Sequence, residues 1–145
     1  MKGLIQRVKR ASVTIDGKVY SKINQGILIL LGVEKGDNEQ NADKLADKLC
    51  KLRIFEDEDG KMNKSILDVN GEILIVSQFT LAGDCKKGTR PSFDKAELPQ
   101  RANELYEYFV DLIKRKNIPV GTGVFGAMMD VELVNDGPVT FMLEF

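Results

Sequence analysis

The stretch from residue 26 to residue 33, GILILLGV, contains only apolar side chains and glycine. A strand with one wet face alternates polar and apolar residues, whereas an unbroken apolar run is typical of a strand buried on both faces. The stretch is also far shorter than the roughly 20 apolar residues that a membrane-spanning helix needs. It therefore predicts a central β-strand that other elements cover on both sides.

The chain before this strand predicts a β-hairpin. In SVTIDGKVYSKI, residues 12–23, the apolar residues Val13, Ile15, Val19 and Tyr20 flank the pair Asp16-Gly17. Asp-Gly between two alternating segments is a strong short-range signal for a tight hairpin turn. We therefore expect the first two strands to pair with each other.

Two later segments have the period of amphipathic helices. DNEQNADKLADKLCKL, residues 37–52, begins with Asp37 and Gln40, whose spacing predicts a capping box at the helix start. A second helix is expected to begin near Pro99, because proline suits the first helical position. The apolar stripes of the two helices are predicted to be Ala42, Leu45, Ala46, Leu49 and Leu52, and Ala102, Leu105, Tyr106, Phe109 and Ile113.

The remaining segments predict further strands and loops. EILIV runs into SQFTLAGD and indicates a buried strand over residues 72–80. The acidic run EDEDG is interpreted as a solvated turn rather than a metal site. AGDCKKGTRPSFD, residues 82–94, has no period and is expected to be a surface loop. NIPVGTGVFGAMMDVELV carries glycines before a strand, and NDGPVTFMLEF is expected to form a turn into a last strand.

These elements predict a mixed architecture for the 145 residues. Two helices cannot serve as the crossovers of about seven strands, so a doubly wound parallel fold is excluded. We expect an α/β or mixed α+β protein, a layered sandwich of mixed β-sheet with two helices, in which residues 1–145 form a single domain. The glycine-rich GTGVFG lacks the Gly-Lys-Ser/Thr ending of a phosphate-binding loop and does not open a helix.

Composition restricts the environment and the partners. The formal net charge is −1, without the basic excess that a general nucleic-acid surface needs, so an RNA partner would be held by its end. The two cysteines have no metal-ligand or CxxC spacing, and no charged leader with an apolar run and cleavage site is evident. We expect a soluble protein of the reducing cytoplasm with no metal and no cofactor.

The polar residues after the buried strand raise a chemical question. Ser77, Gln78 and Thr80 stand at its end, and a hydroxyl nucleophile is usually activated by a histidine, a lysine or an N-terminal amine. The chain has no histidine, and no adjacent lysine is evident. Taken alone, Ser77 and Thr80 are better interpreted as ordinary strand residues whose hydroxyls bond to backbone.

Two motifs resemble a known family. SQFTLAGD at residues 77–84 and NDGPVT at residues 135–140, together with MKGLIQRV at the start and GVFGAMM at residues 123–129, closely resemble the D-aminoacyl-tRNA deacylases over essentially the whole chain. The resemblance implies a compact layered α/β homodimer that hydrolyses the ester joining a D-amino acid to the terminal adenosine of tRNA. It also implies that glycyl-tRNA is accepted, that the role is translation quality control, and that neither DNA nor a membrane is a partner.

The resemblance assigns roles to specific residues. Ser77, Gln78, Phe79 and Thr80 would form the catalytic segment beside the ester, with Gln78 ordering this wall of the pocket. An aminoacyl ester is already activated and its ribose carries a neighbouring hydroxyl, so the protein would supply orientation and donors to the oxyanion. The backbone amides around Phe79 and Thr80 are the candidate donors.

The motif Gly137-Pro138 would act as a chiral filter in the active site of the opposite subunit. The resemblance implies a cis bond whose carbonyls hold the amino group of a D-residue and leave no room for an L side chain. Without the resemblance, a trans turn between two strands is the ordinary interpretation, since only a minority of X-Pro bonds are cis.

Further residues have weaker assignments. Phe125 and Met129 would receive the terminal adenine, because an aromatic face and a thioether suit base stacking, although either could be core. Lys86, Lys87 and Arg90 could meet acceptor-stem phosphates or form a solvated loop.

Two rival classes of function remain open from the sequence. One is a hydrolase of small esters or peptides that uses Thr80 as a covalent nucleophile. The other is a module that binds a nucleotide or an RNA end without turnover. The preferred D-residues, the extent of glycyl-tRNA activity and the dimer surface do not follow from the sequence.

Overall fold

The computed structural model describes residues 1–145 and contains eight strands, two α-helices and one 3₁₀ helix. Six strands form a mixed sheet of order β2-β1-β3-β6-β7, with β8 on the other side of β1, and β4 and β5 form a separate ribbon. The strands are β1 (Lys2–Ile15), β2 (Lys18–Ile23), β3 (Gly26–Gly32), β4 (Phe55–Glu56), β5 (Met62–Lys64), β6 (Glu72–Ser77), β7 (Val120–Thr122) and β8 (Asp130–Glu144), and the helices are α1 (Glu39–Lys51), η1 (Phe79–Ala82) and α2 (Pro99–Lys114).

The central strand is where the sequence predicts it. β3 pairs antiparallel with β1 and parallel with β6, and both of its faces are covered. The hairpin turn is also confirmed, since Asp16 and Gly17 have φ values of 49° and 74°, as expected for the tight turn between β1 and β2. The mixed sheet with two helices confirms the predicted fold class.

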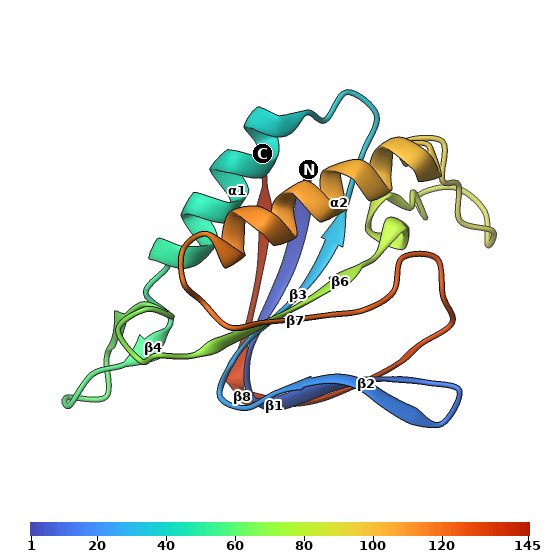
Figure 1. Ribbon diagram of the computed structural model, residues 1–145. Helices are drawn as coiled ribbons and strands as arrows, with labels where there is room; N and C mark the ends of the chain where they lie inside the picture. The colour runs from blue at the N-terminus through green and yellow to red at the C-terminus, as the bar shows by residue number, and fades with distance from the viewer.

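Both α-helices lie on one face of the sheet (Figure 1), and their apolar stripes meet β1, β3 and β6 there. The predicted stripe of α2 is buried, and α2 begins at Pro99 as expected. A second apolar cluster fills the other face, where the long strands β1 and β8 bend and carry β2 beneath the sheet (Figure 1). The hydroxyl of Ser21 donates to the carbonyl of Thr122 at 2.6 Å and joins β2 to β7 there.

The predicted capping box of α1 is wrong by one residue. Asn38 is the N-cap, its side chain accepts from the amide of Gln40, and the side chain of Asn41 accepts from the amide of Asn38. Asp37 is occupied elsewhere, because one of its oxygens accepts from the amide of Glu34 at 2.7 Å. An aspartate engaged in the preceding turn cannot also cap the helix.

The predicted strand over residues 72–80 is too long. β6 ends at Ser77, and residues 79–82 form the 3₁₀ helix η1. The amide of Gln78 makes the last bond to β3, donating to the carbonyl of Leu31 at 2.8 Å. The chain then turns over Gly32, where a β-carbon would lie 3.0 Å from the β-carbon of Leu81. The bare glycine therefore provides the room in which η1 crosses the end of β3.

The predicted turn in NDGPVT is also wrong, because β8 runs through it without reversing. Its pairing with β1 shifts register on both sides of Asn135, and the ladder resumes at Thr140. The side chain of Asn135 donates to the carbonyls of Arg7 and Val139 and accepts from the amide of Val139. These bonds satisfy the backbone inside an irregularity, so the strand can absorb the extra residues as a bulge.

Candidate functional site

A cavity of about 710 Å³ lies where the end of β6, η1, the start of α2 and the loop before β8 meet. Most of its wall is apolar, and its polar side chains are Ser77, Gln78 and Thr80 at the end of β6 and Glu97 shortly before α2. The structure thus brings together six residues from two stretches of sequence about fifty residues apart. These are Ser77, Gln78, Phe79, Thr80, Phe125 and Met129.

The segment at the end of β6 carries most of the polar side chains of the cavity. The side-chain amide of Gln78 donates to the hydroxyl of Thr80 at 2.6 Å. No other side chain hydrogen-bonds to that hydroxyl, so Thr80 has a donor beside it and no base. A nucleophilic threonine needs a group that takes its proton. The arrangement orients the Thr80 hydroxyl without activating it.

The backbone of η1 offers two hydrogen-bond donors. The amides of Phe79 and Thr80 have no acceptor within the chain, whereas the next amide, that of Leu81, donates to the carbonyl of Gln78 at 3.2 Å. The first amides of a helix lack intrahelical partners and carry its positive end. Adjacent free amides on a cavity wall have the character of an oxyanion-binding site.

The opposite wall is formed by the loop of residues 123–129. Phe125 is half-buried, and its ring centroid lies 6.1 Å from that of Tyr106 on α2. The sulfur of Met129 accepts from the amide of Val124 at 3.3 Å. Gly123 lets Met129 fold back, since a β-carbon there would meet the sulfur at 2.7 Å. Phe125 and Met129 are therefore both held by the core and presented to the cavity.

Tyr106, which lies behind the 123–129 loop, keeps its hydroxyl protonated at neutral pH. Burial raises the pKa of Tyr106 to about 12, and its hydroxyl donates to the carbonyl of Ile75 at 2.9 Å. Because that carbonyl belongs to β6, Tyr106 fixes α2 to the strand that leads into the predicted catalytic segment, Ser77 to Thr80. Tyr106 is therefore a support for both walls, and its hydroxyl stays protonated at neutral pH.

The Gly137-Pro138 bond is cis, as the resemblance to the family implies, but the dipeptide lies far from the cavity of its own chain. The dipeptide lies in β8 opposite Arg7 of β1. Arg7 pairs with Ile27 of β3, which in turn pairs with Ile73 of β6. Three strand spacings separate β8 from β6, and Ser77 lies four residues beyond Ile73, which together put the two sites roughly 19 Å apart. Gly137 and Pro138 are exposed.

The β8 bulge that contains Gly137 and Pro138 is held in place by the buried side chain of Arg7 in β1. The guanidinium of Arg7, which is 5% exposed, donates to the carbonyl of Asp136 at 2.9 Å and to that of Ile54 at 2.7 Å. It also forms an ion pair with the Asp136 carboxylate at 3.2 Å. The exposed dipeptide is therefore a rigid surface feature.

Several residues of the cavity were not predicted from the sequence. They come from the first turn of α2, from the position two residues before it, and from the 123–129 loop. Glu97 is the only ionisable side chain among them, and its carboxylate accepts from the amide of Leu98 at 2.7 Å. Nothing local in the sequence marks them, because their place depends on how α2 lies against η1. They are Glu97, Pro99, Ala102, Gly126, Ala127 and Met128.

No group of three or more His, Cys, Asp or Glu side chains is arranged to hold a metal ion. No helix has the length and apolar character to cross a membrane.

Comparison with known proteins gives a consistent result. The family model described as D-Tyr-tRNA(Tyr) deacylase matches residues 4–144. A protein of Geotalea daltonii named D-aminoacyl-tRNA deacylase is 60% identical over 144 residues, covering 99% of this chain and 96% of that protein. A protein of Aquifex aeolicus with the same name is 57% identical, covering 99% and 97%.

Solved structures agree on the fold. A structure titled c-Myc DNA Unwinding Element Binding Protein superposes with a TM-score of 0.94 at 43% identity, covering 100% of this chain and 99% of the other. Another, titled as a probable eukaryotic D-amino acid tRNA deacylase, gives a TM-score of 0.81 at 17% identity, covering 99% and 98%, and shows the fold alone.

Proposed function

The chain belongs to the D-Tyr-tRNA(Tyr) deacylase family, and we propose that it hydrolyses D-aminoacyl-tRNA to free D-amino acid and tRNA while leaving L-aminoacyl-tRNA intact. Its curated relatives, 57% and 60% identical over nearly the whole chain, carry the name of that ester-hydrolysing activity. Glycyl-tRNA, which has no side chain for a filter to reject, is proposed as a second substrate. The cellular role is then proofreading of charged tRNA in the cytoplasm.

The observation that carries this proposal is the pair of free amides beside a hydroxyl that has no base. In ester hydrolysis a water attacks the carbonyl carbon, negative charge develops on the carbonyl oxygen, and the bond to the ribose oxygen breaks. The amides of Phe79 and Thr80, which have no acceptor within the chain and belong to the cavity wall, would donate to that oxygen. The departing ribose oxygen takes a proton, and the neighbouring ribose hydroxyl of the substrate can relay it, so no protein base is required.

The cavity fits the other parts of an aminoacyl adenosine. A volume of about 710 Å³ lies within the range usual for small-molecule sites. Phe125 and Met129 offer an aromatic face and a thioether to the terminal adenine, and Gln78 orders the wall next to the ester. In this arrangement the protein contributes position and charge stabilisation, and the substrate contributes the reactive groups.

We further propose that discrimination between D- and L-residues requires a second copy of the chain. Gly137-Pro138 lies roughly 19 Å from Ser77 within one chain, so it can approach a cavity only in a partner. β8 is an edge strand, and Phe141 and Met142 on it are 40% and 45% exposed. An apolar edge of this kind is typical of an interface. A twofold dimer would then hold two equal composite sites.

The test of the activity uses D- and L-tyrosyl-tRNA with release of free tyrosine as the readout. We expect release from the D-ester alone, with glycyl-tRNA as a further substrate. Release of both enantiomers at equal rates would overturn the proposed filter. Binding of both substrates without release would favour a module that only binds the RNA end.

The composite site is tested by mixing two inactive variants. Ala127→Trp fills the cavity but leaves the dipeptide intact, whereas Gly137→Ala alters the dipeptide and leaves the cavity intact. A mixed dimer contains one intact site, made from the cavity of one chain and the dipeptide of the other, so mixing should restore activity. Analytical ultracentrifugation must first show that each variant dimerises. Mixed dimers that stay inactive would refute composite sites.

A control is needed for Gly137→Ala because the added β-carbon would lie 2.3 Å from the amide nitrogen of Val139 in its own chain. The substitution therefore displaces the local backbone as well as any partner. Recovery of activity in the mixed dimer shows that the cavity of this variant is correctly folded. The same measurement thus distinguishes a blocked site from a misfolded chain.

A further inference from the structure

The proposed function leaves open the path by which the RNA strand reaches the cavity. One surface hollow lies along α2 and shares Phe125 with the cavity, and two others lie beside the loop of residues 83–96, which joins η1 to Glu97 of the cavity wall. A strand that ends in the cavity can bring its phosphates along α2 or over this loop. Phosphates favour lysine and arginine and are repelled by carboxylates, so the charges of the two routes decide between them.

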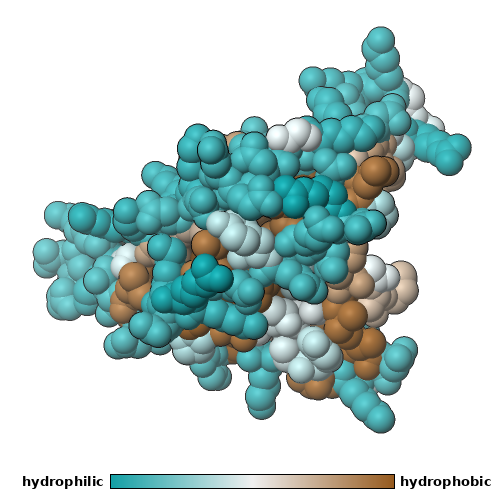
Figure 2. All heavy atoms as spheres, turned by 45° about the horizontal axis from the view of Figure 1, so that its top comes forward, coloured by the Kyte–Doolittle hydropathy of each residue, from teal (hydrophilic) through white to brown (hydrophobic).

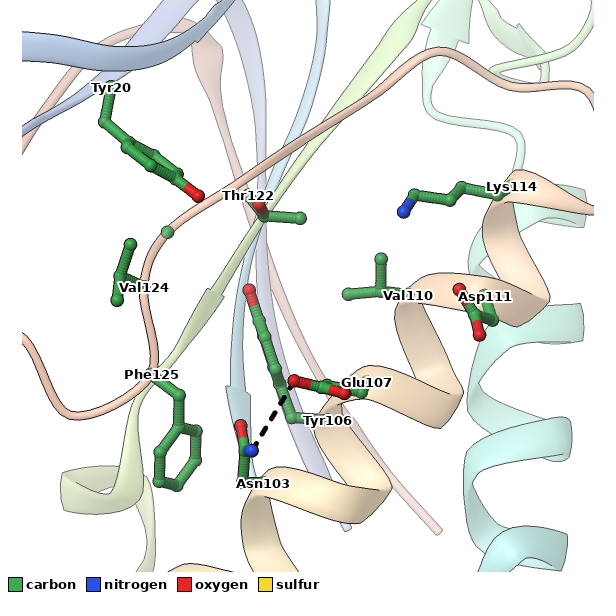
Figure 3. Close-up of a pocket in the computed structure, with 11 residues that line it drawn as sticks. Tyr20, Asn103, Tyr106, Glu107, Val110, Asp111, Lys114, Thr122, Val124 and Phe125 are labelled. Atoms are coloured by element: carbon green, nitrogen blue, oxygen red, sulfur yellow. Dashed lines mark hydrogen bonds between the residues drawn. The ribbon is translucent and has the colours of Figure 1, made fainter.

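The route along α2 is unfavourable for phosphates. The hollow there, about 320 Å³, shares Phe125 with the cavity and is bordered by Glu107, Asp111 and Lys114 (Figure 3). The amide nitrogen of Asn103 is directed to Glu107 (Figure 3). The other polar atom of Asn103, its Oδ1, is buried without a donor and can only accept. This route offers two carboxylates against one ammonium group.

The route over the 83–96 loop has the opposite charge. This loop, which follows η1 in the chain, projects beyond the sheet (Figure 1). Figure 2 shows a mainly hydrophilic surface over the helical side of the molecule. Two hollows of about 400 and 430 Å³ adjoin the loop. The charged residues that line them are Lys2, Lys86, Lys87, Lys95, Asp84 and Asp94.

Most of these lysines are free to bind an anion. Lys86, Lys87 and Lys95 take part in no ion pair, whereas Lys2 is paired with Glu34 at 3.1 Å. The carboxylates of Asp84 and Asp94 form no ion pair with these lysines, and that of Asp84 accepts from the backbone amide of Lys86 at 2.9 Å. The ammonium groups are therefore not neutralised within the chain.

The loop is held in place next to the catalytic segment. Asp84 and Ser92 exchange backbone hydrogen bonds of 2.8 and 3.0 Å across it, and the amide of Lys35 donates to the carbonyl of Lys95 at 2.9 Å. The ring of Phe93 meets that of Phe79 edge to face at 5.0 Å. The lysines are thus carried on a loop that is tied at three points, one of them the catalytic segment itself.

From these charges and contacts we propose that the acceptor strand leaves the cavity over the 83–96 loop, with its last phosphates in the hollows lined by Lys86, Lys87 and Lys95. This inference rests on the proposed function. Ammonium groups contact phosphate oxygens without reading bases, so the grip is independent of the sequence of the strand. The α2 route stays outside the RNA path.

The test compares two variants that change only charge on the surface. Lys86→Ala/Lys87→Ala/Lys95→Ala removes the proposed contacts, and Lys114→Ala, which removes the one ammonium group of the other route, is the control. The probe is a fluorescent RNA with a single-stranded 3′ end, whose Kd is measured over a range of salt. We expect the triple variant to weaken binding about tenfold or more and to make the slope of log affinity against log salt shallower by about 2, at about 0.7 per phosphate.

A small substrate separates this inference from the proposed function. D-tyrosyl-adenosine has no phosphate, so the triple variant should hydrolyse it as fast as the unmodified protein. An unchanged RNA slope in the triple variant, or a larger loss in Lys114→Ala, would overturn the inferred path. Failure of the unmodified protein to hydrolyse either ester would reject the proposed function, while the RNA slopes would still decide the path.

Discussion

Replacing Thr80 by valine removes one hydroxyl from the candidate site and keeps the shape of the side chain. That hydroxyl accepts a hydrogen bond from Gln78 at 2.6 Å, and Thr80 is exposed on the wall of the cavity. No base contacts it. The effect of this substitution on the rate therefore distinguishes a nucleophilic Thr80 from one that only forms part of the ordered cavity wall.

The two roles of Thr80 predict very different losses of rate. A neutral hydrogen bond contributes about 0.5–1.5 kcal/mol net, and a factor of ten in rate corresponds to about 1.4 kcal/mol. If the whole bond to Gln78 were lost in the transition state, kcat would fall by about tenfold at most. Removing a true covalent nucleophile costs on the order of 10⁶, as for the serine of a serine protease. We expect the smaller loss.

The assay is single-turnover release of tyrosine from D-tyrosyl-tRNA by the Thr80→Val protein. A parallel substrate with hydrogen in place of the free hydroxyl of the terminal ribose should react about 10²-fold more slowly or worse with the unmodified protein, since proton relay is worth about 10²–10⁴. A loss above about 10³-fold in a folded Thr80→Val protein, or an acyl group found on Thr80 by mass spectrometry, would refute this reasoning.

Three other expectations concern stability and reactivity. Burial raises the pKa of Tyr106 from 10.0 to about 12, so the folded state holds the phenol proton more tightly than the unfolded state does. This difference contributes about 3 kcal/mol of stability below pH 10, which is lost as the pH rises through 12. The free energy of unfolding of Tyr106→Phe, measured in urea, should therefore depend less on pH between 10 and 12 than that of the unmodified protein. Burial likewise raises the pKa of Cys50 to about 11, so iodoacetamide should label the exposed Cys85 in the native protein and reach Cys50 only after unfolding, which peptide mapping would show. Gly26→Ala should destabilise the fold by about 2–4 kcal/mol in thermal unfolding, because its β-carbon would lie 1.8 Å from the backbone oxygen of Glu72 in β6. An unchanged Tm would show that β3 and β6 can move apart at this point without loss of stability.

The sequence pattern correctly predicted those elements that are determined by residues close together in the chain. The unbroken apolar run at 26–33 predicts β3, and Asp16-Gly17 predicts the first hairpin, because each signal lies within a few residues of its effect. The apolar stripe of α2 and its start at Pro99 follow for the same reason. The capping box failed by one residue because Asp37 has a partner outside the helix.

The sequence motifs also identified the family, but they did not determine where the predicted site residues lie relative to one another in the fold. Strand order and register place Gly137 roughly 19 Å from Ser77, a separation that no local pattern encodes. The end of β6 at Ser77 depends on Gly32 of a neighbouring strand, whose missing side chain lets η1 cross. Tertiary structure alone gave the cavity, since Glu97 and the 123–129 loop reach Thr80 only once α2 has docked on the sheet. Such contacts join residues remote in the chain, and they depend on the packing of whole elements rather than on the propensity of any one segment.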